Sequence, residues 1–123
     1  MKQKFFFCKH CGNVVAKLHD RGTTYCCGER MQELVPCTTD ASEEKHVPVY
    51  EMQGNVVCVT VGAAPHPMTA EHYIEWVCLE TARGFQYVHL TPTDEPHAKF
   101  ALCDGDEVRA VYAFCNQHAL WKA

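Results

Sequence analysis

From residue 47 onward, the chain consists of short runs in which apolar and polar residues tend to alternate. Within residues 72–81, Ile74, Trp76 and Cys78 recur at every second position, which is the period of a β-strand. Turn signals rich in Gly, Pro and Asp separate the runs. Six or seven short strands joined by such turns are typical of an immunoglobulin-like antiparallel β-sandwich, and no convincing helix interrupts them. The expected strands are residues 47–52, 55–62, 72–81, 84–91, 98–103 and 107–114.

Residues 1–36 follow a different pattern, dense in Cys, Gly and charge and poor in long apolar runs. Only residues 13–18 and 31–35 are candidate strands. A segment this short cannot bury a core sufficient for its own stability, so we expect it to need a metal ion or a partner chain. The polar residues 37–45 read as a linker, and the sandwich domain is expected over residues 46–123. The predicted fold class is therefore mainly β.

Composition narrows the possible functions. The net charge is −4 and the charges are interspersed, so no nucleic-acid-binding face is expected. No apolar run approaches the roughly 20 residues that span a membrane, and the N-terminal apolar run is too short for a signal peptide. We therefore expect a soluble, cytoplasmic protein. Its 9 cysteines and 8 histidines favour metal binding over disulfides, because the cytoplasm is reducing.

Four cysteines in the N-terminal segment form the first candidate site. Cys8 and Cys11 make a C-x-x-C pair, and the adjacent Cys26 and Cys27 follow 14 residues later. Four thiolates suit a tetrahedral zinc or iron site, and the spacing alone does not decide between these metals. Neighbouring residues tend to point their side chains apart, so both can reach one ion only where the backbone bends. We expect a distorted site.

A second candidate site needs residues from distant parts of the chain. Cys115 and His118 have a spacing that lets both face one ion, but they are only part of a ligand set. His46, His66 and His72 each lie where a loop meets a predicted strand. Such junctions can converge at one end of a sandwich, close to the Cys115 loop. A lone histidine is more often a surface residue, and His10, His19, His89 and His97 are taken as such.

Several motifs of the chain resemble the superoxide reductases. They are EEKHVPV at residues 43–49, GAAPHPMTAEHYIEWV at 62–77 and CNQHALWK at 115–122. The four-cysteine segment resembles the desulforedoxin-like domain that precedes them in the two-iron desulfoferrodoxins. The resemblance covers essentially the whole chain. Four motifs in the right order and spacing are far more specific than any one of them alone.

The resemblance implies two iron ions per chain. One would be an Fe(Cys)4 centre held by Cys8, Cys11, Cys26 and Cys27. The other would be an Fe(His)4Cys centre, with Cys115 as the axial ligand and with His46, His66, His72 and His118 as the equatorial ligands.

The resemblance also implies the reaction and the partners. Superoxide would be reduced by one electron to hydrogen peroxide at five-coordinate Fe(II). Glu44 and Lys45 match the family's mobile carboxylate and catalytic lysine, although without the resemblance they read as a solvated charge run. An external electron donor such as rubredoxin and a homodimer are also implied.

Two other functions are compatible with the residues. A zinc-stabilised β-domain acting as a binding module would be colourless and contain zinc. A superoxide dismutase would produce peroxide without consuming a reductant. Zinc rarely takes five side-chain ligands in proteins, which favours iron for the second site.

Overall fold

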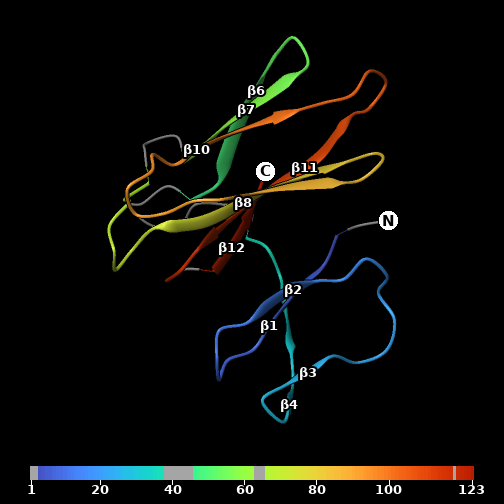
Figure 1. Cartoon of the computed structure of the whole chain (residues 1–123), viewed down its shortest axis with the longest axis vertical. Coiled ribbons are helices and arrows are strands. Elements are labelled where there is room, and N and C mark those ends of the chain that lie inside the picture. Colours follow the sequence, from blue (N-terminus) through green and yellow to red (C-terminus); the bar gives the residue numbers. More distant parts are fainter. Residues whose placement is uncertain (1–2, 38–45, 63–65, 118) are drawn as a thin grey trace. The chain divides into compact units, whose positions relative to one another are not determined.

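The computed structural model describes residues 3–37, 46–62, 66–117 and 119–123, and every regular element among them is a β-strand (Figure 1). The strands that pair do so antiparallel. The chain divides into two compact units, Met1–Val35 and Pro36–Ala123. This architecture confirms the predicted mainly β class. Within the described residues, no helix is long and apolar enough to cross a membrane.

The first unit consists of a three-stranded sheet and a small two-stranded hairpin. In the sequence, the hairpin lies between the second and third strands of the sheet. The strand β1 (Phe5–Phe7) lies in the centre and pairs with β2 (Val14–Ala16) and β5 (Gln32–Leu34). The hairpin consists of β3 (Tyr25–Cys26) and β4 (Glu29–Arg30).

The core of the first unit is very small. Among its described residues, only Phe5, Cys8 and Met31 are buried hydrophobics, and one of these is a candidate metal ligand. So little buried apolar surface cannot offset the conformational entropy lost on folding. Bound metal is therefore expected to contribute to the stability of this unit.

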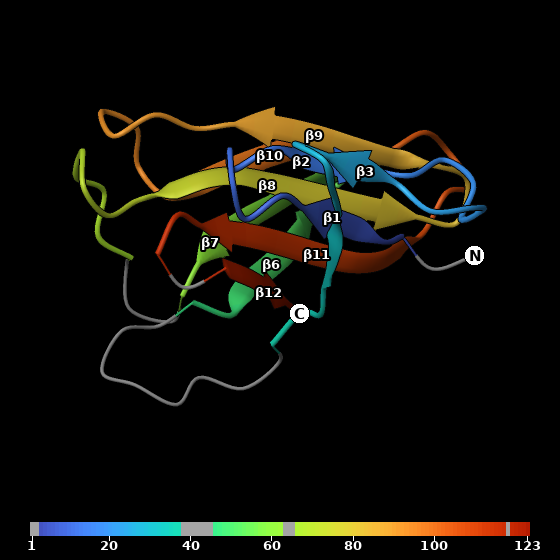
Figure 2. The same ribbon diagram turned by 90° about the horizontal axis from the view of Figure 1, so that it is seen from below.

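The second unit is an antiparallel sandwich of two sheets. One sheet has the order β10-β7-β6 and comprises β6 (Pro48–Gln53), β7 (Val56–Val61) and β10 (His97–Ala101). The other has the order β12-β11-β8-β9 and comprises β8 (Ile74–Thr81), β9 (Phe85–His89), β11 (Val108–Cys115) and β12 (Ala119–Lys122). Figure 2 shows the strands of this second sheet side by side in that order.

Alternating side chains of both sheets form the core of the sandwich. In β7, Val57, Val59 and Val61 are buried, while the residues between them are half-buried. The longer β8 is mostly buried on both faces, because Val77 and Leu79 join the core while the residues beside them are also covered. Cys115 ends β11 inside this core cluster, which places its thiol at the end of the sandwich interior.

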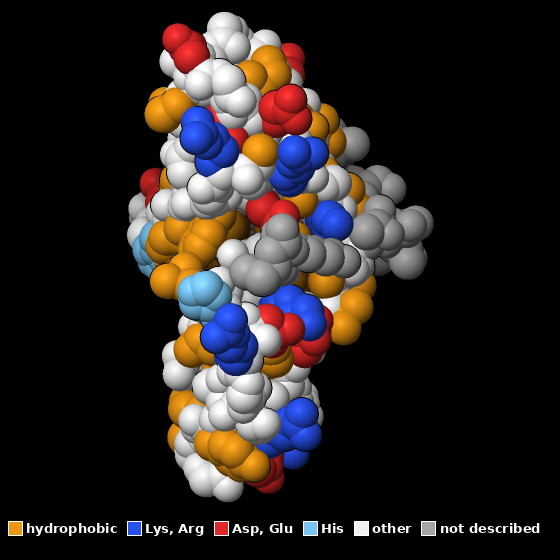
Figure 3. All heavy atoms as spheres, turned by 90° about the vertical axis from the view of Figure 1, so that its right-hand side faces the viewer, with side chains coloured by type: hydrophobic (Ala, Val, Ile, Leu, Met, Phe, Trp, Pro, Cys, Tyr) orange, Lys and Arg blue, Asp and Glu red, His pale blue; other side chains and the backbone are white. Residues whose placement is uncertain are grey.

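Four of the strands were not predicted from the pattern, and two of these, β3 and β4, have only 2 residues each. The strand β1 is a run of three phenylalanines without alternation, and β12 is only 4 residues long. Of the predicted linker, residues 38–45 lie outside the described part of the chain. Cys37 forms a parallel β-bridge with Trp121 and belongs to the second unit. On the face drawn in Figure 3, acidic and basic side chains are interspersed within each unit.

Candidate metal centres

The four N-terminal cysteines converge on one point. The sulfur atoms of Cys8, Cys11, Cys26 and Cys27 all lie within 4.8 Å of one another. The Sγ–Sγ distance is 3.6 Å between Cys11 and Cys26 and 3.9 Å between Cys26 and Cys27. A tetrahedral ion with metal–sulfur bonds of about 2.3 Å requires sulfur–sulfur distances of about 3.8 Å. The arrangement fits a single four-coordinate ion.

The backbone supplies the bends that this convergence requires. In the first loop, the Cys8 N–H donates to the Asn13 carbonyl at 2.9 Å, and the Gly12 N–H donates to the Cys8 carbonyl at 2.8 Å. In the second loop, Cys27 has a φ of 54°, a left-handed conformation that is uncommon for a residue with a side chain. This turn lets two neighbouring cysteines face the same point.

The four sulfurs strongly affect one another's ionisation. Backbone N–H groups, chiefly that of Cys11, lower the pKa of Cys8 to about 7. Hydrogen bonds with Cys11 and Cys26 raise the pKa of Cys27 to about 12. The cluster therefore stabilises the thiolate of one cysteine but disfavours ionisation of another. All four thiols can be ionised together only when a cation is bound among them. The Asn13 amide also donates to Cys26 Sγ at 3.8 Å, which would tune a bound metal.

The second cluster lies in the second unit and contains three imidazoles and a thiol. One ligand atom from each of His46, His66, His72 and Cys115 lies within 4.8 Å of the others. His66 and His72 belong to the connection between β7 and β8, His46 precedes β6, and Cys115 ends β11. The ring centroids of His46 and His66 are 4.7 Å apart, as are those of His66 and His72, and both pairs meet edge to face. The rings therefore surround a common centre.

Burial and hydrogen bonding prepare this cluster for a metal. His46, His66 and Cys115 are buried, with exposed fractions of 1%, 3% and 0%. His66 Nδ1 lies 2.8 Å from the Pro67 carbonyl, and only a protonated Nδ1 can donate there, so the lone pair of the neutral ring is on Nε2. A second ring nitrogen that donates to a carbonyl is typical of histidine ligands.

Asn116 joins the two loops that carry the ligands. Its Oδ1 accepts from the Tyr73 N–H at 2.9 Å, and its Nδ2 donates to the Glu71 carbonyl at 3.1 Å. The Asn116 N–H also donates to the Tyr73 carbonyl at 3.2 Å. The residue that follows Cys115 is thereby tied to the residues on both sides of His72. We call these three bonds the Asn116 clamp.

Trp121 is a further neighbour of the cluster, and no sequence pattern indicated it. Its indole stacks on the His46 ring, with centroids 4.5 Å apart and an angle of 15° between the planes. The motif CNQHALWK contains both Asn116 and Trp121, but nothing in their spacing indicates these contacts. The predicted ligand His118 and the predicted catalytic residues Glu44 and Lys45 lie outside the described residues.

The remaining cysteines show no metal-binding arrangement among the described residues. Cys78 is buried on the face of β8 opposite the core cluster, and burial raises the pKa of its thiol to about 12. Cys58 is half-buried and lies outside the core cluster. Cys37 and Cys103 are exposed.

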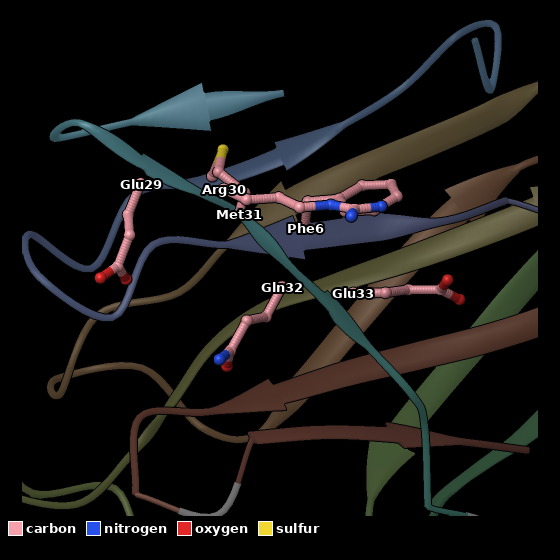
Figure 4. Close-up of a pocket in the computed structure, with 6 residues that line it drawn as sticks. All are labelled: Phe6, Glu29, Arg30, Met31, Gln32 and Glu33. Atoms are coloured by element: carbon pink, nitrogen blue, oxygen red, sulfur yellow. The ribbon is translucent and has the colours of Figure 1, made fainter. Parts of the chain in front are cut away.

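A surface groove in the first unit involves none of the predicted ligands (Figure 4). The carboxylates of Glu29 and Glu33 point away from each other, so they do not form a paired acidic site. Glu29 instead forms an ion pair with Lys9 at 3.4 Å, and one of its carboxylate oxygens lies 3.0 Å from His10 Nε2. The residues that line the groove are Phe6, Glu29, Arg30, Met31, Gln32 and Glu33.

The fold and the two clusters define an all-β protein with two separate candidate metal centres, one built of sulfur and one of imidazole and thiolate. The family model for desulfoferrodoxin matches residues 38–123. The chain belongs to the desulfoferrodoxin family, which confirms the resemblance seen in the sequence.

Relatives match both units of the chain. The desulfoferrodoxin of Nitratidesulfovibrio vulgaris is 44% identical over 122 residues, which cover 98% of this chain and 94% of the relative. A desulfoferrodoxin homolog of Archaeoglobus fulgidus is 44% identical over 117 residues, covering 94% of this chain and 92% of the relative. Among solved structures, the superoxide reductase of Treponema pallidum is 36% identical with a TM-score of 0.88, covering 99% of this chain and 98% of that one.

Proposed function

We propose that the protein is a superoxide reductase. In this reaction one superoxide, one electron and two protons give one hydrogen peroxide. The observation that carries the proposal is the group of three imidazoles and one thiol at the end of the sandwich, of which all but the half-buried His72 are buried. The full-length likeness to a superoxide reductase of known structure supports the same reaction.

We propose iron as the metal of both clusters, with two ions per chain. For the second cluster, the five ligands would be His46, His66, His72, Cys115 and His118. Structural zinc sites take four ligands, so a five-ligand set of nitrogen and sulfur favours iron. Iron bound there would supply the electron that reduces superoxide, and the Cys115 thiolate would favour its donation.

The chain's own residues would give the reaction its geometry and its access to substrate. The buried rings of His46 and His66 keep bulk water from most of the site. The Asn116 clamp holds the Cys115 and His72 loops at a fixed separation. Lys45 is proposed to attract the superoxide anion and to orient the water that supplies a proton. Glu44 is proposed as a mobile carboxylate that would serve as a further ligand to iron.

The four-cysteine centre is proposed to store or relay electrons from an external donor such as rubredoxin. It lies in a separate unit with its own backbone loops, so it can be altered without removing any ligand of the second cluster. A Cys11→Ser variant therefore separates the two roles. We expect it to lose the visible spectrum of the four-cysteine centre while it retains superoxide reduction.

A homodimer and a cytoplasmic location complete the proposal. β6 lies at the edge of its sheet and exposes Val49, Tyr50 and Met52, and an exposed apolar edge favours pairing with a second copy. None of the nine cysteines forms a disulfide, which suits a reducing compartment. Sedimentation at several protein concentrations tests the dimer.

Metal analysis of the purified protein, combined with its visible spectrum, tests the proposed class. We expect two irons per chain, absorption from the four-cysteine centre, and a thiolate-to-iron band on oxidation. A colourless protein with zinc in both sites would instead indicate a zinc-stabilised binding module.

A further inference from the structure

Trp121 combines two features that its place in the fold does not require. The first is the close stack on His46, with centroids 4.5 Å apart and planes at 15°. The second is its Nε1–H group, which is buried and has no hydrogen-bond partner in the part of the chain that the structure describes. The side chain as a whole is 9% exposed. Buried tryptophan N–H groups usually have a partner, so this donor calls for an explanation.

The backbone holds the indole firmly against His46. Trp121 lies in β12, where it pairs with Ala113 of β11. On its other side, the Cys37 N–H donates to the Leu120 carbonyl and the Lys122 N–H donates to the Cys37 carbonyl, both at 2.9 Å. The strand β11 on one side and the Cys37 bridge on the other therefore fix the main chain of this residue. An aromatic ring fixed in this way restricts the rotation of the imidazole that it covers.

A plain packing role would not need tryptophan. Phenylalanine offers a flat ring for stacking and has no N–H group to leave unpaired. The cost of a buried, unpartnered donor is removed if an acceptor binds beside His46. In a site that holds metal, the acceptors of suitable size are water and small oxygen-bearing or nitrogen-bearing anions.

We propose that Trp121 is a positioning residue of the His/Cys centre, in which its ring fixes the orientation of His46 and its Nε1–H donates a hydrogen bond to a water molecule or small anion bound there. This inference rests on the proposed function, because it requires a metal at the second cluster. It adds to that function a hydrogen-bond donor for the anionic substrate that is independent of Lys45.

Two variants separate the ring from the N–H group. Trp121→Phe keeps a ring over His46 and removes the donor, whereas Trp121→Leu removes both. Trp76→Phe is the matched control, because Trp76 is the other tryptophan of the chain, is 6% exposed, and stacks on Phe114.

The test uses azide as the probe anion and the full-length, iron-loaded protein. Azide affinity is measured by visible titration, and the ligand field at the iron is measured by electron paramagnetic resonance of the oxidised protein. Since one hydrogen bond contributes about 0.5–1.5 kcal/mol, Trp121→Phe should weaken azide binding by about 2- to 12-fold. Its resonance spectrum should change little. Trp121→Leu should alter that spectrum as well, and Trp76→Phe should match the wild type in both measurements.

Each result decides one part of the inference. Wild-type azide affinity in Trp121→Phe would overturn the role of the N–H group, whatever happens to Trp121→Leu. A wild-type resonance spectrum in Trp121→Leu would overturn the positioning of His46. If Trp121→Leu does not fold, the same spectrum of a Trp121→His variant, whose smaller ring leaves part of His46 uncovered, decides that point. A wild-type protein without iron or without superoxide reduction would instead overturn the proposed function, and the inference would fall with it.

Discussion

Removing the two side-chain bonds of the Asn116 clamp should weaken metal binding more than it weakens the fold. Asn116→Ala deletes the two side-chain hydrogen bonds, to the Tyr73 N–H and to the Glu71 carbonyl, at 2.9 and 3.1 Å. The backbone bond from the Asn116 N–H to the Tyr73 carbonyl remains. The cavity left by one small, exposed side chain is negligible. The loss is therefore confined to the connection between the Cys115 loop and the His72 loop.

The size of the effect follows from these two bonds. A typical hydrogen bond contributes about 0.5–1.5 kcal/mol, and both bonds are solvent-exposed, so the variant without metal should lose about 1–2 kcal/mol. In a domain of this size, such a loss lowers Tm by roughly 5–10 °C. Residues that orient metal ligands commonly contribute about 10- to 100-fold to metal affinity, so we expect about a tenfold loss of iron affinity at the second cluster.

Urea unfolding of the metal-free and iron-loaded forms measures both effects. Asn55→Ala is the matched control, because Asn55 Nδ2 makes one hydrogen bond, of 3.3 Å, to the Leu102 carbonyl and touches no candidate ligand. The control should lose the same small amount of stability in both forms. Asn116→Ala should lose more in the iron-loaded form. Equal losses in the two forms, together with an unchanged iron affinity, would refute the idea that the clamp positions the ligands.

Three further predictions concern single side chains. Cys115→Ser should abolish superoxide reduction while the spectrum of the four-cysteine centre persists, and near-normal turnover would remove the thiolate from the mechanism. Lys45→Ala should slow the reaction with superoxide by at least about tenfold and weaken its salt dependence without loss of iron, whereas the exposed control Lys99→Ala should not. The Lys4 ammonium, 2.6 Å from Asp20, holds the pKa of that carboxyl below its usual 3.8. Because the pKa is lower in the folded state, the ion pair stabilises fully above the unfolded-state pKa and its contribution is lost as pH falls through the folded-state pKa. The difference in urea midpoint between wild type and Asp20→Asn should therefore shrink on acidification below about pH 4, and a constant difference down to pH 2 would contradict this.

The strands of the sandwich were predictable because their sequence obeys local rules. In β7 and β10, burial alternates residue by residue, as the apolar pattern indicates. β1 was missed because three consecutive phenylalanines have no period, although only Phe5 is fully buried. β12 was missed because it is a short strand that begins immediately after the Cys115 loop, at an alanine with a φ of 68°. A run without a period and a strand of four residues both give no signal in the pattern of apolar residues.

The candidate sites also differ in how far local sequence predicts them. The cysteine pairs are close in sequence, so spacing alone indicated a four-sulfur site, and the left-handed Cys27 supplies the predicted bend. The three described histidines come from two different connections, and their convergence depends on how the two sheets pack. Their assignment to one ligand set therefore rested on the family resemblance. The contacts of Asn116 and Trp121 depend on the same packing, and no spacing rule predicts them.

The central claim is that this chain reduces superoxide rather than dismuting it. The most direct measurement is the yield of hydrogen peroxide per superoxide consumed by the iron-loaded protein with a supplied reductant. A reductase gives one peroxide per superoxide and consumes one electron from the reductant for each. The account predicts this ratio. A yield of one peroxide for every two superoxides, with no reductant consumed, would contradict it.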